Sequence, residues 1–131
     1  MAEGPKKVML VEDDKFLSSL IKARLEKDGL AVIQSFDGDE AIKRMPDERP
    51  DLVILDLVMP KTNGFDVLKA ISSMPGLDRT PVVVVSNLAQ DSDIDKAREL
   101  GAKAYFVKVK ISIDDLVGKI ENLVQQPIQP L

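Results

Sequence analysis

The stretch Leu52–Pro60, LVILDLVMP, decides the fold of this chain. Its first four residues are apolar without polar alternation, which is typical of a strand covered on both faces in a parallel sheet. Pro60 cannot donate a hydrogen bond to a neighbouring strand, so the strand ends before it and leaves Asp56 at its carboxyl end. Open α/β sheets keep their binding sites at that edge. An isolated aspartate after a strand can equally cap a turn. Residues elsewhere in the chain are therefore needed to distinguish a functional site from a turn cap.

Four further apolar runs predict strands, and three of them also end in polar residues that suit a site. The exception is Leu30–Ile33. Polar residues are mixed into the end of this run, which favours a strand at the edge of the sheet. Val82–Val85 is the most β-branched run and predicts a buried, internal strand. The runs Val8–Val11, Val82–Val85 and Ala104–Val107 are followed by Glu12 and Asp13, by Ser86 and by Lys108, respectively.

Segments with apolar residues at helical spacing separate these runs, and capping residues bound them. Asp14 is placed to cap the first helix, Pro46 to stop the second, and Asp91 or Ser92 to cap the fourth. The fourth helix has only a narrow apolar stripe, so most of it should face water or a partner. The expected helices are 16–25, 37–45, 65–71, 94–100 and 113–124.

The alternation of strands and helices predicts a single α/β domain. Five strands with a helix after each imply a parallel sheet with right-handed crossovers and helices on both faces. Residues 1–126 would form this domain, and residues 127–131 a C-terminal tail or linker remnant. No second fold is needed for a chain of 131 residues.

The carboxyl ends of parallel strands share one edge of the sheet, so distant polar residues should form a single site. Three carboxylates brought together repel one another unless their pKa values rise or a cation lies between them. Oxygen ligands without nitrogen or sulfur favour Mg²⁺ that keeps several of its waters. A lysine and a serine hydroxyl are superfluous for metal storage but suit the oxygens of a phosphoryl group. The residues expected at this edge are Glu12, Asp13, Asp56, Ser86 and Lys108.

The composition excludes several classes of function. The sequence has no Cys and no His, which removes disulfides, zinc and haem ligation, and catalysis by thiols or imidazoles. With 18 basic and 22 acidic residues the net charge is −4, and no basic block of the kind that binds nucleic acid occurs. The sequence also has no apolar run of signal-peptide length and none of the roughly 18 residues that span a membrane. We therefore expect a soluble cytoplasmic protein that binds neither nucleic acid nor a membrane.

From about Lys6 to Gln126 the chain resembles a response-regulator receiver domain of two-component signalling, of the chemotaxis-receiver-like kind. Each matching motif is weak alone, but all five occur in order and at the family's spacing. They are Val11-Glu12-Asp13, Asp56 within Leu55–Pro60, Gly64, Val85-Ser86-Asn87, and Lys108 three residues after Tyr105. The resemblance implies a flavodoxin-like (βα)5 domain with strand order 2-1-3-4-5.

The resemblance also implies a role for each residue of the site. Asp56 would be the phosphoacceptor and would receive a phosphoryl group from a phosphohistidine of a histidine kinase or phosphotransfer protein. Lys108 would pair with that phosphoryl group. Mg²⁺ would be held by the Asp13 and Asp56 carboxylates and the Val58 carbonyl, with Glu12 acting through bound water.

The resemblance further implies a switch built from two residues. Ser86 would form a hydrogen bond with a phosphoryl oxygen and move toward it, opening space into which Tyr105 turns. This change would alter the surface of the 94–100 helix, the last strand and the final helix, which a downstream protein effector would read. The chain would be a signalling switch rather than an enzyme, although it would assist its own phosphorylation and its slow dephosphorylation.

Two positions depart from the family pattern, and two others bear on the lifetime of the phosphoryl group. Val109 stands where the family usually has proline after a cis peptide bond. A cis bond before another residue costs about 2.5 to 4 kcal/mol, which favours a trans bond and a differently aimed Lys108. Asn87 replaces a small residue and narrows access to the phosphoacceptor. Val58 and Leu88 flank the path of attacking water in the family, and since neither side chain can hold water here, we expect slow dephosphorylation.

Three alternatives use the same residues differently. An Asp-nucleophile phosphatase of the haloacid dehalogenase type needs a second Asp two residues after the first, where this chain has Val58. A flavodoxin needs a hydroxyl-rich phosphate loop after the first strand, where Glu12, Asp13 and Asp14 would repel the FMN phosphate. A receiver-like scaffold that binds partners without phosphorylation would not need the complete set of acids, serine and lysine.

Overall fold

The computed structural model describes residues 4–125, in which five strands alternate with five α-helices. The strands are β1 (Lys7–Val11), β2 (Ala31–Ser35), β3 (Leu52–Leu55), β4 (Val82–Ser86) and β5 (Ala104–Val107). The α-helices are α1 (Lys15–Lys27), α2 (Gly38–Glu48), α3 (Gly64–Ser72), α4 (Asp91–Glu99) and α5 (Ile113–Gln125). A single 3₁₀ turn, η1 (Lys108–Lys110), follows β5. The expected tail, residues 127–131, lies outside the described residues.

The strands form one parallel sheet in the order β2-β1-β3-β4-β5, which confirms the expected flavodoxin-like topology. β3 lies at the centre, and all four of its residues are buried. β2 is an edge strand and β4 an internal one with five buried residues, as the sequence predicts. Leu55 is in register with Val11 on one side and Val84 on the other. The three central strands therefore end at the same edge.

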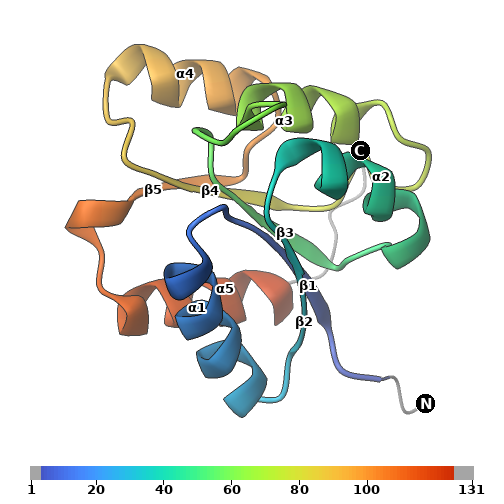
Figure 1. Cartoon of the computed structure of the whole chain (residues 1–131), viewed down its shortest axis with the longest axis vertical. Coiled ribbons are helices and arrows are strands. Elements are labelled where there is room, and N and C mark those ends of the chain that lie inside the picture. The colour runs from blue at the N-terminus through green and yellow to red at the C-terminus, as the bar shows by residue number, and fades with distance from the viewer. Residues whose placement is uncertain (1–3, 126–131) are drawn as a thin grey trace.

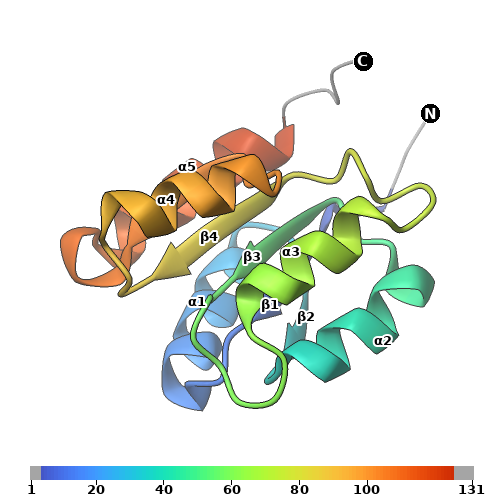
Figure 2. The same cartoon turned by 90° about the horizontal axis from the view of Figure 1, so that it is seen from above.

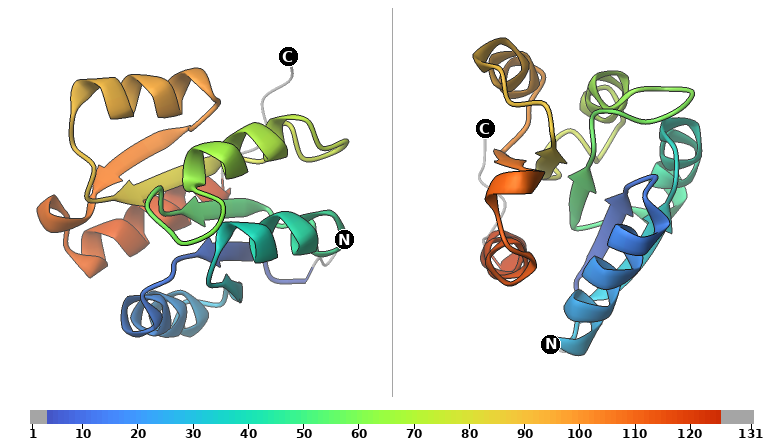
Figure 3. Two further views of the ribbon diagram at one scale, coloured as in Figure 1. Left: turned by 45° about the horizontal axis from the view of Figure 1, so that its top comes forward. Right: turned by 60° about the vertical axis from the view of Figure 1, so that its left-hand side comes forward.

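Helices cover both faces of the sheet, with α1 and α5 on one side and α2, α3 and α4 on the other (Figures 1 and 2). Side chains alternate along β3, so Leu52 and Ile54 pack with α1 and α5. Val53 and Leu55 pack with the three helices of the opposite layer. Figure 3 shows the sheet enclosed between these two layers. This enclosure explains why the strands have no polar alternation.

The residues that bound α2 and α4 differ from the stop and capping residues expected from the sequence. Pro46 does not stop α2 but lies inside it, and the helix continues to Glu48 before Arg49 takes a left-handed conformation with φ 45°. A proline in the last turn costs the helix one backbone hydrogen bond, whereas its φ is still helical. The residue that caps α4 is Gln90 rather than Asp91 or Ser92, and its N–H donates to Asp93 Oδ2 at 3.3 Å.

The expected exposure of the fourth helix is confirmed, because Ala97 is the only buried residue of α4. By contrast, α5 buries Leu116, Val117, Ile120 and Val124. Within residues 4–125, no helix combines the length and the apolar character needed to cross a membrane.

Candidate functional site

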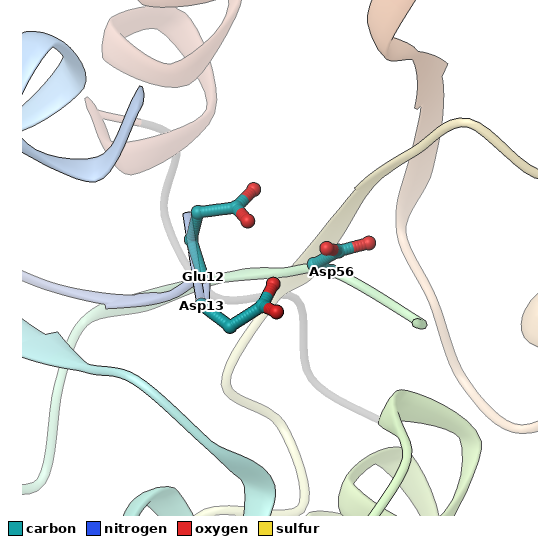
Figure 4. A group of neighbouring side chains, drawn as sticks. All are labelled: Glu12, Asp13 and Asp56. Atoms are coloured by element: carbon teal, nitrogen blue, oxygen red, sulfur yellow. The ribbon is translucent and has the colours of Figure 1, made fainter. Parts of the chain in front are cut away.

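The ends of β1 and β3 bring three carboxylates together at the carboxyl edge of the sheet. Each of Glu12, Asp13 and Asp56 offers an oxygen, and these oxygens all lie within 4.8 Å of one another. Figure 4 shows the Glu12 and Asp13 side chains extending from the end of β1 toward Asp56. The predicted convergence of these acids is therefore present, and the donors are all oxygen, as Mg²⁺ prefers.

The two acids after β1 lie in different environments. The Glu12 backbone N–H donates to the Ser35 carbonyl at 3.0 Å, which continues the β1–β2 pairing, and the Glu12 side chain is buried. Asp13 is exposed at the mouth of the site. Asp14 accepts a hydrogen bond from the Leu17 N–H at 3.1 Å and caps α1, as expected. Only Asp13 and Asp14 therefore separate the buried Glu12 from the first residue of α1.

Lys108 joins the two buried carboxylates of the site. Its Nζ lies 2.7 Å from Glu12 Oε1 and 3.1 Å from Asp56 Oδ2. Asp56 is 5% exposed, and its N–H donates to the Val11 carbonyl at 3.0 Å. The carboxylate is therefore held on a fixed backbone, with a cation beside one of its oxygens.

Burial and neighbouring charges shift the pKa values of Glu12 and Lys108. Burial raises the pKa of Glu12 from 4.5 to about 7, although hydrogen bonds from Lys108 and from the Asp14 N–H act against it. Burial lowers the pKa of Lys108, but its hydrogen bond to Glu12 and the charge of Asp56 outweigh this and raise it above its usual value. Lys108 therefore stays charged, whereas Glu12 readily takes up a proton unless a further cation joins the site.

The Ser86 and Tyr105 side chains meet at the backbone of Leu88. Ser86 is fully buried, and its Oγ accepts a hydrogen bond from the Leu88 N–H at 3.2 Å. The Tyr105 hydroxyl donates to the Leu88 carbonyl at 2.7 Å. Burial and the charge of Asp93 raise the pKa of Tyr105. A single residue of the loop after β4 therefore links the two predicted switch residues.

The residues that bear on access to Asp56 lie around the site. The Val58 N–H donates to Asp56 Oδ1 at 3.3 Å, so the Val58 backbone runs beside the carboxylate while its side chain is 59% exposed. The peptide bond before Val109 is trans, as expected. Lys108 nevertheless reaches Glu12 and Asp56, so a trans bond does not take the ammonium group out of the site.

Sequence reasoning missed two features of this site. The first is the short contact between Glu12 and Lys108, because the family resemblance implies for Glu12 only a role through metal-bound water. The signal available in the sequence was the position of Glu12 directly after the apolar run of β1. The second is Leu88, which acts through its backbone N–H and carbonyl. Backbone groups are common to all residues, so the sequence carried no signal for it.

Comparison with known proteins identifies the group to which this arrangement is similar. A family model described as the response regulator receiver domain matches residues 8–121. The transcriptional regulatory protein CpxR of Escherichia coli is 38% identical over 122 residues, covering 92% of this chain and 50% of CpxR. The chain spans about half the length of the curated relatives it matches first.

Solved structures show the same fold. The manganese-bound form of response regulator Rcp1 is 31% identical with a TM-score of 0.82, covering 97% of this chain and 100% of that one. The phosphorylated cyanobacterial phytochrome response regulator RcpA is 34% identical with a TM-score of 0.77, covering 92% and 91%.

Proposed function

Because this chain belongs to the response-regulator receiver domain family, we propose that Asp56 accepts a phosphoryl group in a Mg²⁺-dependent transfer and thereby switches a protein-binding surface. The observation that carries the proposal is the pairing of the buried Asp56 carboxylate with Lys108 Nζ at 3.1 Å beside two further acids. The family match also favours this reading over the phosphatase and flavodoxin alternatives.

The acidic cluster fits a divalent cation by its chemistry. Three carboxylate oxygens within 4.8 Å repel one another, and the raised pKa of Glu12 shows that a single lysine does not fully offset its burial. Hard oxygen ligands of this number suit Mg²⁺, which keeps several waters. The Asp13 and Asp56 side chains and the Val58 carbonyl would hold the ion, with Glu12 reaching it through water. Bound Mg²⁺ would offset the negative charge that develops on the transferred phosphoryl group.

The transfer itself uses Asp56 as a nucleophile. One carboxylate oxygen of Asp56 attacks phosphorus, and an acyl phosphate forms as the P–N bond of the donor's phosphohistidine breaks. The electron pair of that bond returns to the imidazole of the donor, which takes up a proton. These 131 residues contain no His, so the phosphohistidine lies outside them, and its proposed carrier is a histidine kinase or a phosphotransfer protein.

Lys108 changes partners in the course of this transfer. Before transfer its ammonium group contacts Glu12 and Asp56. Afterwards it pairs with a phosphoryl oxygen, since that oxygen carries the new negative charge beside Asp56. Lys108 thus stabilises both the acceptor and the product.

Ser86 and Tyr105 carry the switch. In the structure both are tied to Leu88, so the loop after β4 is held by two hydrogen bonds. A phosphoryl oxygen at Asp56 gives the Ser86 hydroxyl a charged partner, which competes with the Leu88 N–H. Moving Ser86 loosens the loop and lets Tyr105 turn inward. The sparsely buried α4 would then shift relative to β5 and α5, and a protein effector would bind the altered surface.

Apolar side chains around the site suit a protein as the phosphoryl donor. Phe16 is 76% exposed, Val58 59% and Val109 81%, and each lies within three residues of an acid or lysine of the cluster. Exposed large apolar side chains close to a site favour contact with a protein partner. We therefore expect the phosphohistidine to be presented by a protein that contacts these side chains beside Asp56.

Dephosphorylation should be slow in the absence of a phosphatase. The Val58 and Leu88 side chains cannot hold an attacking water by hydrogen bonding. The lifetime of the acyl phosphate can be followed by intact mass after removal of the phosphodonor in Mg²⁺ buffer. A half-life of minutes or longer is expected, and one of only seconds would contradict this reasoning.

Incubation with acetyl phosphate and Mg²⁺, followed by intact mass spectrometry, tests the proposal. One added phosphoryl group is expected for the wild-type chain, and none for Asp56→Asn or when EDTA replaces Mg²⁺. Asp66→Asn, which changes a carboxylate in the first turn of α3, is the matched control and should be phosphorylated normally. No added mass on the wild-type chain would instead favour a scaffold that acts without phosphorylation.

A further inference from the structure

The loop between β3 and α3 carries Val58 past Asp56 and is closed at its base. The Gly64 N–H donates to the Leu57 carbonyl at 3.0 Å, so the chain leaves and re-enters the fold at neighbouring points. A Cβ on Gly64 would lie 2.4 Å from the Asp56 carbonyl oxygen. Only glycine therefore permits this closure, and the base of the loop is fixed against the backbone of the phosphoacceptor.

The far end of the same loop rests on the first turn of α2 (Figure 2). A Cβ on Gly38 would lie 2.1 Å from the Thr62 carbonyl oxygen, and that oxygen belongs to the backbone, which cannot rotate away. The Thr62 hydroxyl also donates to Asp39 Oδ1. Lys61 adopts a left-handed conformation with φ 66° at this contact. Steric fit and a hydrogen bond thus hold the end of the loop.

The first turn of α2 is a fixed support for this contact. Asp37 caps the helix by accepting a hydrogen bond from the Glu40 N–H at 2.8 Å. Ala41 and Met45 anchor the helix in the core with no exposed area. The ion pair between Lys61 Nζ and Asp37 Oδ2 at 3.5 Å is partly exposed and contributes little. The support therefore depends on the backbone contact of Gly38 and the hydrogen bond of Asp39 with Thr62, and not on this ion pair.

We propose that Gly38, Asp39 and Thr62 are positioning residues that hold the Val58 backbone beside Asp56 and so set the divalent-cation affinity of the acidic cluster. The Val58 segment lies between the two fixed ends of the loop, so a displacement at Thr62 is transmitted to it. The N–H of Val58 already contacts Asp56 at 3.3 Å, which shows that this segment borders the site. The affinity part of the inference rests on the proposed function; the positional part does not.

Gly38→Ala tests the steric contact and Thr62→Val the hydrogen bond. Thr62→Ser keeps the hydroxyl and should therefore retain the Mg²⁺ affinity and the amide signals of the wild-type chain. Gly118→Ala is the matched control, because a Cβ there meets open space in α5. Two quantities are measured at a temperature at which each variant is folded: the Mg²⁺ dissociation constant by titration calorimetry, and the amide signals of Asp56 and Val58 by NMR without metal. Since supporting contacts around metal ligands typically change affinity 10–100-fold, Gly38→Ala should weaken Mg²⁺ binding about tenfold or more.

The expected pattern is a shifted Val58 amide and weaker Mg²⁺ binding in Gly38→Ala and Thr62→Val, and wild-type values in Thr62→Ser and Gly118→Ala. A purely structural contact would lower the free energy of unfolding and leave both quantities unchanged, which would overturn the inference. If Gly38→Ala does not fold, Thr62→Val decides by the same two measurements. A wild-type chain that binds no Mg²⁺ would overturn the proposed function and the affinity part, while the amide signals would still decide the positional part.

Discussion

At the scale of single residues, Lys108 determines the charge of the site. It contacts two carboxylates that are each at most 5% exposed, and one ammonium group cannot neutralise both. The site is therefore negative before any metal binds, and its acids either bind protons or bind a cation. This balance leads to two predictions at the same scale.

Replacing Lys108 by methionine should destabilise the metal-free protein and strengthen its binding of Mg²⁺. Two buried carboxylates would lose their common partner, at a cost of about 1 to 3 kcal/mol in the free energy of unfolding. The same loss removes a cation that competes with the metal for Glu12 and Asp56. Urea denaturation and calorimetric titration measure the two effects. Lys110→Met, an exposed change in the same 3₁₀ turn, is the control, and equal stability of the two variants would contradict the prediction.

The pKa of Glu12 predicts how stability depends on pH without metal. Because burial raises this pKa from 4.5 to about 7, the folded chain binds more protons than the unfolded chain between these values. The free energy of unfolding should therefore contain a component that falls as the pH rises through this window. Denaturation in EDTA from pH 5 to pH 8, compared between the wild-type chain and Glu12→Gln, measures it. The variant should show a shallower decline, and identical slopes would be evidence against a buried, easily protonated Glu12.

At the scale of elements, packing explains which sequence-based expectations failed. Asp91 and Ser92 are both good capping residues, yet the cap of α4 is Gln90, whose N–H donates a hydrogen bond to the Asp93 side chain. Pro46 is tolerated since the missing hydrogen bond falls in the last turn of α2, where the buried Met45 still holds the helix to the core. Tertiary packing therefore outweighed local preference in α2. In α4, the Asp93 side chain in the first turn determined which residue caps the helix.

Gly118 in α5 is a position where local preference is not satisfied. It is exposed, and an added Cβ would meet nothing within 4 Å. Gly118→Ala should therefore raise the free energy of unfolding by about 0.5 to 1 kcal/mol, because alanine loses less backbone entropy on folding. Urea denaturation measures the change. A decrease would mean that α5 needs flexibility or space at this point.

At the scale of the whole molecule, the parallel sheet brings Glu12, Asp13, Asp56 and Lys108 together from the ends of three strands, and β4 ends beside them at Ser86. The sequence was sufficient to predict this because β1, β3, β4 and β5 contain continuous apolar runs, and the first polar residue after each run marks the carboxyl edge of the sheet. The individual acids, Ser86 and Lys108 followed from that rule. The contact of Thr62 with Gly38 did not follow, since it depends on the absence of a side chain and on a backbone oxygen. The hydrogen bonds of Leu88 with Ser86 and Tyr105 did not follow either, because they involve backbone groups that are common to all residues.

Locating the phosphoryl group chemically tests whether Asp56 is the phosphoacceptor. Borohydride reduction converts an aspartyl phosphate to homoserine, which peptide mass spectrometry identifies after treatment with acetyl phosphate and Mg²⁺. We expect reduction at Asp56 alone and only when Mg²⁺ is present during the treatment. Reduction at Asp13 or at another carboxylate, or equal labelling in EDTA, would contradict it.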